Sequence, residues 1–553
     1  MTAEIDLKQL VGWIRDHWHV LLLVFILLFG AKLRAYHANY PVIGYHNWKE
    51  VHYLTEARNF AREGLFAHGF FVPAFDYPEL THDPSGAHSD SFPTISILVA
   101  TAFKIIGTQL WMARWIGILF NLGAIIYTYL LVKQLFKREN LALTTAAVMA
   151  INPLLIFFSR NVQLESPALF FMIGAAYYGA KWHEHEGKRQ LLLAAAFFGA
   201  AVLTRYDYAL IALPLAFIFP WKRAQQLIFH PQIRYWWAIG ALLLLVVPLW
   251  FWYSNYYLPD VLPGEQGGAV NLDIIDFSKP FEKEFWQGQK SYLADNFTII
   301  PGIGMLIFGL AAFLALLKRN TGSHFMMGYI LVSIPWFFLM ADKLSGHSYH
   351  WFPIVPLFSF LVAFGFTVLG QTIEQLVKWK FVHIGIVLLL LIWLTVPSIA
   401  AANRQFNTQF FGLDIAGEYI NAHSRPEERV FHSSHQSYGV LWHADRKGYK
   451  NPGTLAELQQ GEQMNASWVF VYQWGFSLLQ NAEVWGTIHQ SYHPVQFAFV
   501  QEGDNLQPFY LLLKKGGTFD EEVFAAEVQK APLRKKAYEL SDGQFTLQYV
   551  NLE

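Results

Sequence analysis

Ionisable side chains gather in one polar segment, residues 37–92, which lies between apolar stretches of the sequence. Its members are His46, Lys49, Glu50, His52, Glu56, Arg58, His82, Asp83, His88 and Asp90. A carboxylate can take a proton from an attacking hydroxyl group or orient a metal ion, and cationic groups can hold a phosphate through charge-assisted hydrogen bonds. A solvated amphipathic helix with scattered polar residues would have a similar composition, so this segment alone leaves both interpretations open.

Three shorter polar turns between apolar runs carry further charge. They contribute, in chain order, Arg160 with Glu165, Arg205 with Asp207, and Lys343 with His347 and His350. The first two pairs could be structural ion pairs at helix ends. Ionisable groups at membrane depth are costly unless they are paired or line a wet cavity, so we expect one polar cavity that collects them. Such a cavity suits a lipid phosphate, with an apolar groove for the lipid tail.

The elements that must position these residues are membrane helices. The 553 residues are 54% hydrophobic and 17% aromatic, which is too apolar for one water-soluble core. The first apolar run, HWHVLLLVFILLFGAKLRAY, lacks a small-residue cleavage site, so we expect a retained transmembrane helix. With it, the apolar runs predict about eleven spans. The others are 109–132, 141–158, 166–182, 190–204, 206–221, 236–255, 299–317, 325–341, 351–370 and 381–401.

The segment 93–107 decides the orientation. It has 15 residues and carries Lys104, so it could cross the membrane or lie at its surface. If it does not cross, the later basic clusters fall on the side of the N-terminus, which is then the cytoplasm. We therefore expect an interfacial helix, a cytoplasmic N-terminus, and outer loops at 37–92 and 256–298. The chain is expected in an inner or plasma membrane.

Residues 402–553 differ in pattern from the preceding 401 residues. Their apolar runs shorten to strand length (RVFHSS, ASWVFVYQ, QFAFVQE and PFYLLLKK) and alternate with polar helical stretches such as LDIAGEYINAHS. We expect a soluble extracytoplasmic α/β domain here, after a membrane domain at 1–401. Its histidines are interpreted as surface groups and not as a metal site. The net charge of −1 gives no argument for a nucleic-acid partner, and the absence of cysteine excludes thiolate chemistry.

Several stretches together resemble a known group. KEVHYLTEARNFAREG resembles the first-loop motif of GT-C glycosyltransferases of the protein O-mannosyltransferase and aminoarabinose transferase type, in which an acidic pair precedes a helix containing Ala-Arg. SDSFPTISILVATAFKIIGTQLWMARWIGILFNL, SRNVQLESPALFF and YHWFPIVPLFSFLVAF are similar to later family segments, in the same order. The resemblance spans roughly 17–400. It implies a polytopic α-helical GT-C fold and inverting sugar transfer from a polyprenyl-phosphate donor to a protein, lipid or glycan acceptor.

The resemblance also suggests roles for single residues. Glu50 falls on the second acidic residue of the pair and is the first candidate for general base, while Glu165 matches an acidic position beside the donor. Asp90 is a third carboxylate that could take over. Lys49 replaces the first acidic residue, and Asp90 to Pro93 also depart from the family pattern. The candidates for binding the donor phosphate are Lys49, Arg114, Arg160, Arg205, Tyr349 and His350.

Lys49 bears on both cofactor and activity. A lysine cannot serve as base or metal ligand in place of an aspartate, although it can neutralise a phosphate, which favours a metal-independent mechanism. The resemblance allows metal-assisted and metal-free chemistry, so Mg²⁺ or Mn²⁺ stays open as a cofactor and the metal ligands are unknown. Two alternatives remain, a catalytically inactive lipid-binding subunit and a lipid or solute transporter. Against a transporter, no two repeated halves are found in the sequence, and the charge gathers at one face.

Overall fold

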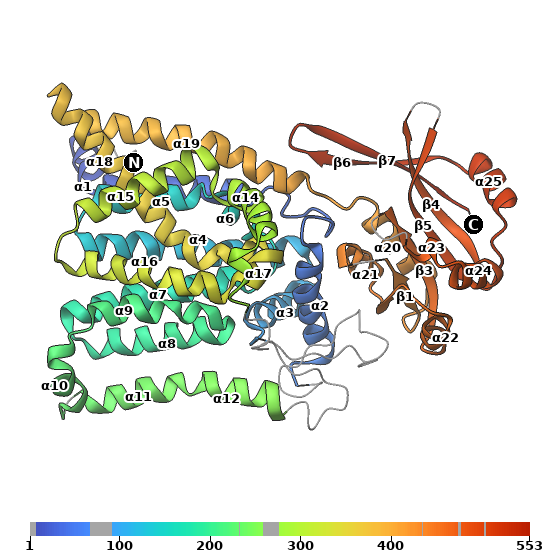
Figure 1. Cartoon of the computed structure of the whole chain (residues 1–553), viewed down its shortest axis with the longest axis horizontal. Helices are drawn as coiled ribbons and strands as arrows, with labels where there is room; N and C mark the ends of the chain where they lie inside the picture. The colour runs from blue at the N-terminus through green and yellow to red at the C-terminus, as the bar shows by residue number, and fades with distance from the viewer. Residues whose placement is uncertain are drawn as a thin grey trace, which may run out of the picture. The chain divides into compact units, whose positions relative to one another are not determined.

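The computed structural model describes residues 7–66, 91–231, 233–257, 276–433, 435–473, 477–502 and 505–552. The predicted carboxylate Asp90, together with His82, Asp83 and His88, lies outside these residues. The chain divides into two compact units (Figure 1). The first comprises Met1–Ala38, Arg114–Trp252 and Val270–Ala402, and the second comprises Asn39–Ala113, Tyr253–Ala269 and Asn403–Glu553.

The first unit is helical throughout its described part, because its sequence is a series of apolar runs joined by short polar turns. Its longer helices are α1 (Leu7–Arg34), α4 (Leu110–Phe136), α5 (Glu139–Ala150), α7 (Glu165–His185), α8 (Lys188–Thr204), α11 (Arg234–Leu244), α14 (Lys283–Phe297), α15 (Gly304–Ala315), α16 (Thr321–Leu339), α18 (Val355–Val377) and α19 (Val382–Asn407). Shorter helical turns complete it: α6 (Pro153–Phe158), η1 (Tyr206–Ile211), α9 (Ala212–Ile218), η2 (Trp221–Arg223), α10 (Ala224–Phe229), α12 (Val246–Trp252), η5 (Lys279–Phe281), η6 (Ile299–Ile303), α17 (Ala341–Gly346) and η7 (Ser348–Ile354). The turn η3 (Tyr253–Tyr257) follows α12 directly and belongs to the second unit.

Six helices within the described residues are long and apolar enough to cross a membrane. They are Arg15–Arg34, Leu110–Phe136, Arg234–Tyr257, Thr321–Leu339, Ser348–Val377 and Val382–Asn407. The pair Lys283–Phe297 and Ile299–Ala315, which is bent by 86°, makes a seventh if it counts as one span. The polytopic helical architecture is confirmed, whereas the expected number of about eleven is not established. The expected spans at 141–158, 166–182, 190–204 and 206–221 are helical but shorter, interrupted or less apolar.

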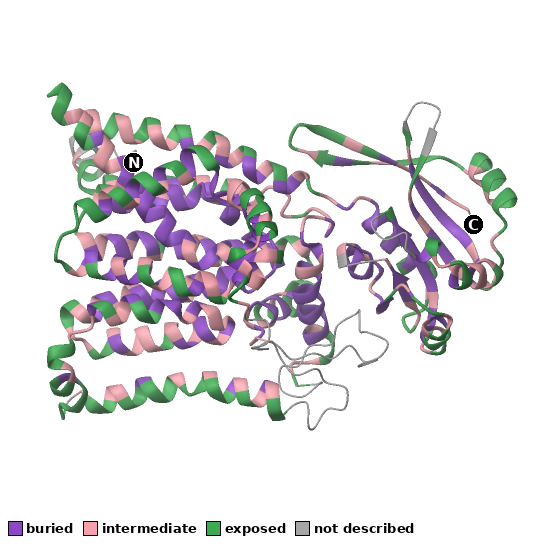
Figure 2. Ribbon diagram, in the orientation of Figure 1, coloured by how far each residue is buried: buried purple, intermediate pink, exposed green. Residues whose placement is uncertain are grey.

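Among the candidate membrane spans, the one that contains α18 is the most deeply buried. In the apolar window of Ser348–Val377, 72% is buried, whereas the corresponding windows of α1 and α19 are 11% and 17% buried; Figure 2 colours the buried residues purple. Helix α18 packs on α15 and α5, and glycines permit the first contact. A Cβ atom at Gly309 would lie 1.9 Å from the carbonyl oxygen of Leu361, so only glycine fits at this crossing.

The expected span at 141–158 is interrupted by a proline. Helix α5 ends at Ala150 and α6 begins at Pro153, because proline removes a backbone donor and suits the first position of a new helix. The side chain of Asn152 caps α6 by accepting a hydrogen bond from the Leu155 backbone N–H at 3.1 Å. The break lets the chain turn into the polar residues that follow α6.

The second unit contains a seven-stranded mixed sheet in the order β2-β1-β3-β5-β4-β7-β6. The strands are β1 (Arg429–His432), β2 (Gly448–Lys450), β3 (Ala466–Tyr472), β4 (Tyr492–Glu502), β5 (Asn505–Lys515), β6 (Arg534–Leu540) and β7 (Gly543–Asn551). Strand β1 pairs in parallel with β2 and β3, and the remaining pairs are antiparallel. Its helices are α2 (Asn47–Glu63), α3 (Thr94–Ile106), α20 (Leu413–His423), η8 (His435–Ser437), α21 (Gly439–Ala444), α22 (Leu455–Gln463), α23 (Ser477–Gln480), α24 (Ala482–Ser491) and α25 (Glu521–Lys530). The expected C-terminal α/β architecture is confirmed.

Ion pairs and amide hydrogen bonds connect the N-terminal part of this unit, Asn39–Ala113, to its C-terminal part, Asn403–Glu553. Arg62 donates two hydrogen bonds to Asp445, at 2.9 and 2.6 Å, and Arg58 forms an ion pair with Asp445 at 3.0 Å. The Asn47 side chain donates to the Gln436 carbonyl oxygen at 3.0 Å and accepts from the Gly439 N–H at 3.2 Å. Helix α2 therefore packs on α21, and α3, which has 13 residues, packs on α2.

Candidate functional site

The polar segment 159–166, which comprises the turn between α6 and α7 and the first two residues of α7, is buried. Arg160, Asn161, Gln163 and Glu165 are each at most 4% exposed. Glu165 is the first residue of α7, where the positive end of the helix dipole stabilises a carboxylate. The segment therefore carries functional groups at a position where a purely structural connection would be apolar or solvated.

Arg205 links this segment to two other elements through one guanidinium group. Its Nη1 donates to Glu165 Oε1 at 2.6 Å, its Nε to Asp207 Oδ1 at 3.1 Å, and its Nη2 contacts His350 Nδ1 at 3.0 Å. The side chains of Arg205, Glu165 and Asp207 are 12%, 1% and 11% exposed. These four residues form a buried cluster, which we call the Arg205 cluster.

The tautomer of His350 follows from its contact with Arg205. A guanidinium group only donates hydrogen bonds, so Nδ1 of His350 accepts and the ring proton resides on Nε2. The imidazole is then a neutral donor at Nε2. Tyr349 lies beside it with ring centroids 4.6 Å apart, and the ring of His347 stacks on Tyr349 at 5.3 Å.

Several buried oxygen atoms around the Arg205 cluster lack a hydrogen-bond partner among the described residues. These atoms are Glu165 Oε2, Asp207 Oδ2, Asn161 Oδ1, Gln163 Oε1, Ser159 Oγ and Ser166 Oγ. A buried polar group without a partner costs about 1–3 kcal/mol, so such groups are rare in folded proteins. Five of the six lie between residues 159 and 166, and this concentration suits a ligand that supplies hydroxyl or other hydrogen-bond donors.

A second cluster of the first unit is cationic. Arg114 and Arg160 each donate a hydrogen bond of 3.0 Å to the backbone carbonyl oxygen of His37, which follows α1. Burial, together with the positive charges of Arg160 and Arg114, lowers the pKa of His37 to about 3. The imidazole is therefore neutral at ordinary pH, and the potential at this point favours an anion.

Helix α14 positions the segment that carries Tyr349 and His350. Gln289 donates to the Leu344 carbonyl oxygen at 2.7 Å, and Asn296 donates to the Ser348 carbonyl oxygen at 3.0 Å. The Asn296 carbonyl oxygen in turn accepts from the Asn152 side chain at 3.1 Å, which connects α14 to the cap of α6. These amides were not among the residues expected from the sequence, because neutral side chains on a helix give no charge signal.

Glu50 and Lys49 belong to the second unit, in the first turn of α2. Glu50 is 3% exposed, and the Lys49 ammonium group lies 5.3 Å from the centre of the Tyr53 ring. A neighbouring carboxylate, Glu56, is engaged by His52 at 2.5 Å and by the Ser96 hydroxyl at 2.7 Å. Glu56 is thus part of a local structural pair, whereas Glu50 is a second buried carboxylate of the same helix.

The structure assembles part of the expected site. Glu165, Arg205 and His350 are in contact, and Arg114 and Arg160 converge on His37. The partner of Glu165 is Arg205 and not the nearby Arg160, and Arg205 also pairs with Asp207, which was the structural alternative for these two residues. Within the described ranges, no group of three or more His, Asp or Glu side chains is placed to hold a metal ion. The two carboxylates of the Arg205 cluster share a cationic side chain instead.

Comparison with known proteins finds one family model and several solved structures that are similar to this chain. Residues 88–252 match the family model described as dolichyl-phosphate-mannose-protein mannosyltransferase. The match contains Arg114, Arg160, Glu165, Arg205 and Asp207. No curated protein matches the chain.

Solved structures share the fold at low sequence identity. The archaeal oligosaccharyltransferase AglB from Archaeoglobus fulgidus, in complex with an inhibitory peptide and a dolichol-phosphate, has a TM-score of 0.52 at 12% identity, covering 90% of this chain and 74% of its own. ArnT from Cupriavidus metallidurans, bound to undecaprenyl phosphate, has a TM-score of 0.54 at 13% identity, covering 91% and 98%. The chain therefore has the GT-C fold, as expected from its sequence, and its described residues include six helices that are long and apolar enough to cross a membrane.

Proposed function

We propose that the chain is a membrane glycosyltransferase that transfers a sugar from a polyprenyl-phosphate donor to an acceptor at the outer face of the membrane. The observation that carries the proposal is the buried Arg205 cluster, in which Glu165 keeps one oxygen atom without a partner in the described part of the chain. Two proteins of the same fold support the donor class, because AglB was solved with dolichol-phosphate and ArnT with undecaprenyl phosphate.

The donor phosphate is assigned to cationic groups of the chain. Arg114 and Arg160 provide two buried guanidinium groups at one point, and the Nε2–H of His350 provides a neutral donor. As the bond between sugar and phosphate breaks, negative charge develops on the leaving oxygen, and fixed donors stabilise it most in a site that excludes water. Arg205 already compensates the charges of two carboxylates. We therefore assign it the role of positioning Glu165 and not that of binding the phosphate directly.

The reaction we infer is a single displacement. A nucleophilic group of the acceptor attacks the anomeric carbon, the bond from that carbon to the phosphate oxygen breaks, and the polyprenyl phosphate leaves with the bonding electrons. The acceptor proton passes to a carboxylate, for which Glu50 is the first candidate and Asp90 the alternative. Glu165 accepts hydrogen bonds from sugar hydroxyl groups. A single displacement inverts the configuration at the anomeric carbon, and Lys49 favours phosphate neutralisation without a metal ion.

Release of free polyprenyl phosphate tests the proposal. The full-length chain in nanodiscs would be incubated with a panel of polyprenyl-phosphate sugars and acceptors, with and without Mg²⁺ or Mn²⁺. We expect turnover by the wild type and its loss in Glu50→Gln and Glu165→Gln. The matched control is Glu184→Gln, because Glu184 lies on the same helix as Glu165 but is exposed and paired with Lys137. If the wild type binds the lipids and turns none of them over, an inactive binding subunit replaces the enzyme as the explanation.

A further inference from the structure

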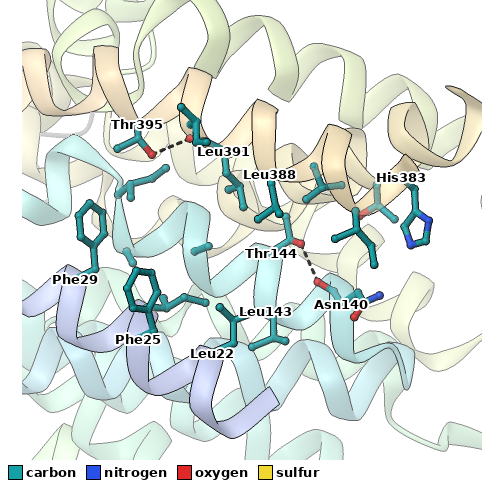
Figure 3. Close-up of a pocket in the computed structure, with 18 of the residues that line it drawn as sticks. Leu22, Phe25, Phe29, Asn140, Leu143, Thr144, His383, Leu388, Leu391 and Thr395 are labelled. Carbon is teal, nitrogen blue, oxygen red and sulfur yellow. Dashed lines mark hydrogen bonds between the residues drawn. The ribbon is translucent and has the colours of Figure 1, made fainter. Parts of the chain in front are cut away.

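An apolar groove lies on the surface of the first unit between α1, α5 and α19 (Figure 3). Its volume is about 310 Å³. Leu22 and Phe25 of α1, Leu143 and Ala147 of α5, and Leu388 and Leu391 of α19 form its walls. The hydroxyl groups of Thr144 and Thr395 also face it, but each donates to a carbonyl oxygen of its own helix, at 2.8 and 2.7 Å. The body of the groove is therefore suited to a hydrocarbon chain.

The groove has the depth of one membrane leaflet. Along α1 it extends from Trp18 to Phe29, which is about 16 Å at the rise of an α-helix. The hydrocarbon core of a bilayer is about 30 Å thick, so the groove reaches roughly halfway through it. Trp18 marks its outer limit at the N-terminal end of the span Arg15–Arg34, the position where aromatic side chains meet lipid headgroups.

Polar side chains line one end of the groove. Figure 3 shows Asn140 and His383 at one end, and Phe29 and Thr395 at the other. Along α1, Phe29, Phe25 and Leu22 follow one another toward the Asn140 end, and Trp18 is the next residue of α1 that lines the groove in this direction. Asn140 is near the start of α5 and His383 near the start of α19. His383 also bonds to Glu374, which fixes its ring. An occupant with one polar end would thus have a defined direction.

The polar end is also the cationic end. Arg138 precedes Asn140 by two residues, and Lys378 and Lys380 lie four and two residues before the start of α19. All three are exposed, and none forms an ion pair with another described residue, in contrast to Lys133 with Glu139 and Lys137 with Glu184. These three cations are therefore available to an anionic headgroup.

We propose that this groove binds an anionic phospholipid of the leaflet on the N-terminal side, with an acyl chain against Leu22, Ala147 and Leu388. Its phosphate lies near Arg138, Lys378 and Lys380. The occupant differs from a polyprenyl-phosphate donor in direction. Arg114 and Arg160 bind the His37 carbonyl oxygen beyond the opposite end of α1, so a donor phosphate there would place the lipid the other way round. The inference does not depend on the proposed activity.

Two double variants, which change the net charge by the same amount, test whether the groove recognises an anionic headgroup. Full-length protein freed of lipid in detergent would be titrated with dioleoylphosphatidylglycerol and dioleoylphosphatidylcholine, and bound lipid counted by native mass spectrometry. We expect the wild type to prefer phosphatidylglycerol, and the Lys378→Glu/Lys380→Glu double variant to lose about tenfold of that affinity. The control is Lys318→Glu/Arg319→Glu, because these residues are also exposed in a loop between membrane helices. It should retain the preference.

A third substitution tests the acyl chain. Ala147→Phe places a ring in the groove, and we expect it to remove the bound lipid while the double variant lowers only the preference for the anionic headgroup. Equal binding of both lipids by every variant would overturn the proposal, because the groove would then contact only bulk lipid. Loss of a copurified polyprenyl lipid from Ala147→Phe, without loss of phospholipid, would overturn it in favour of a donor-tail groove. If Ala147→Phe does not fold, the paired charge variants decide the outcome.

Discussion

The strongest prediction concerns the removal of Arg205. The substitution Arg205→Met keeps a long side chain but deletes the group that bonds to Glu165, Asp207 and His350. Two carboxylates then remain in a site where Glu165 is 1% exposed and Asp207 is 11% exposed. The change therefore leaves buried charge without a counter-charge, which is the most damaging way to break an ion pair.

The expected cost follows from this burial. Breaking a buried ion pair by removing one partner costs about 3–5 kcal/mol, whereas an exposed pair contributes about 1 kcal/mol or less. The chain offers a control of the second kind, because Arg223 bonds to Glu186 at 2.8 Å with side chains 55% and 31% exposed. We expect Arg205→Met to lower the free energy of unfolding by about 3 kcal/mol or more, and Arg223→Met by about 1 kcal/mol or less.

Reversible unfolding in mixed micelles, followed by circular dichroism, measures both variants. Adding Glu165→Gln to Arg205→Met should restore about 1–3 kcal/mol, because it removes one of the stranded charges. Arg205→Lys should fall between wild type and Arg205→Met, since an ammonium group keeps the charge but cannot reproduce the guanidinium fork. Equal losses in Arg205→Met and Arg223→Met, or strict additivity with Glu165→Gln, would refute the reasoning that Arg205 compensates a buried Glu165.

Three further predictions concern positioning and pH. Asn296→Ala removes the donor to the Ser348 carbonyl oxygen, so it should lower kcat several-fold with little change in KM. Tyr292→Phe, at a half-buried residue on the same helix, should leave both constants near wild type, and a change in KM alone would contradict a positioning role. Asp445 is partly buried, which opposes ionisation, yet Arg62 and Arg58 hold its pKa below the usual value. Its contribution to stability should be present above the unfolded pKa of about 3.9 and be lost as pH falls through the lower folded value, and Asp445→Asn should abolish this loss in thermal unfolding. The pKa of His37 is lowered to about 3, so the unfolded chain binds a proton that the folded chain does not between about pH 6.5 and 3. Stability should fall as pH decreases through this window, and His37→Gln should flatten that part of the curve; an unchanged slope would show that His37 does not titrate as described.

The helices were predictable because apolar runs of membrane length have few other physical solutions. The position of the break in 141–158 was available in the Asn152-Pro153 pair, yet the prediction treated the run as one span. In the C-terminal region, the four strands expected from apolar runs are present. Strands β2, β6 and β7 were missed, since β2 has three residues and β6 begins with Arg534, Lys535 and Lys536 at a sheet edge.

The site was predictable in its residue types but only partly in its partners. Glu165 was expected to be near a basic group, and sequence proximity suggested Arg160 as one partner. Its partner is Arg205, forty residues away, because α7 and α8 pack together and bring their ends into contact. No role could be assigned to Asn296 and Gln289 from the sequence. The role of an amide side chain on a helix depends on the carbonyl group to which it donates, and only the structure identifies that group.

The contact of Arg62 with Asp445 joins residues that are 383 positions apart in the chain. At ribosomal rates of about 5–20 residues per second, the partner of α2 is synthesised roughly 20–80 s after α2 itself. During that interval α2 has been synthesised, but α21, against which it packs in the folded chain, has not. The second unit can therefore be completed only after nearly all of the chain has been made, so a chain that stops before Asp445 would leave α2 exposed to chaperones and proteases.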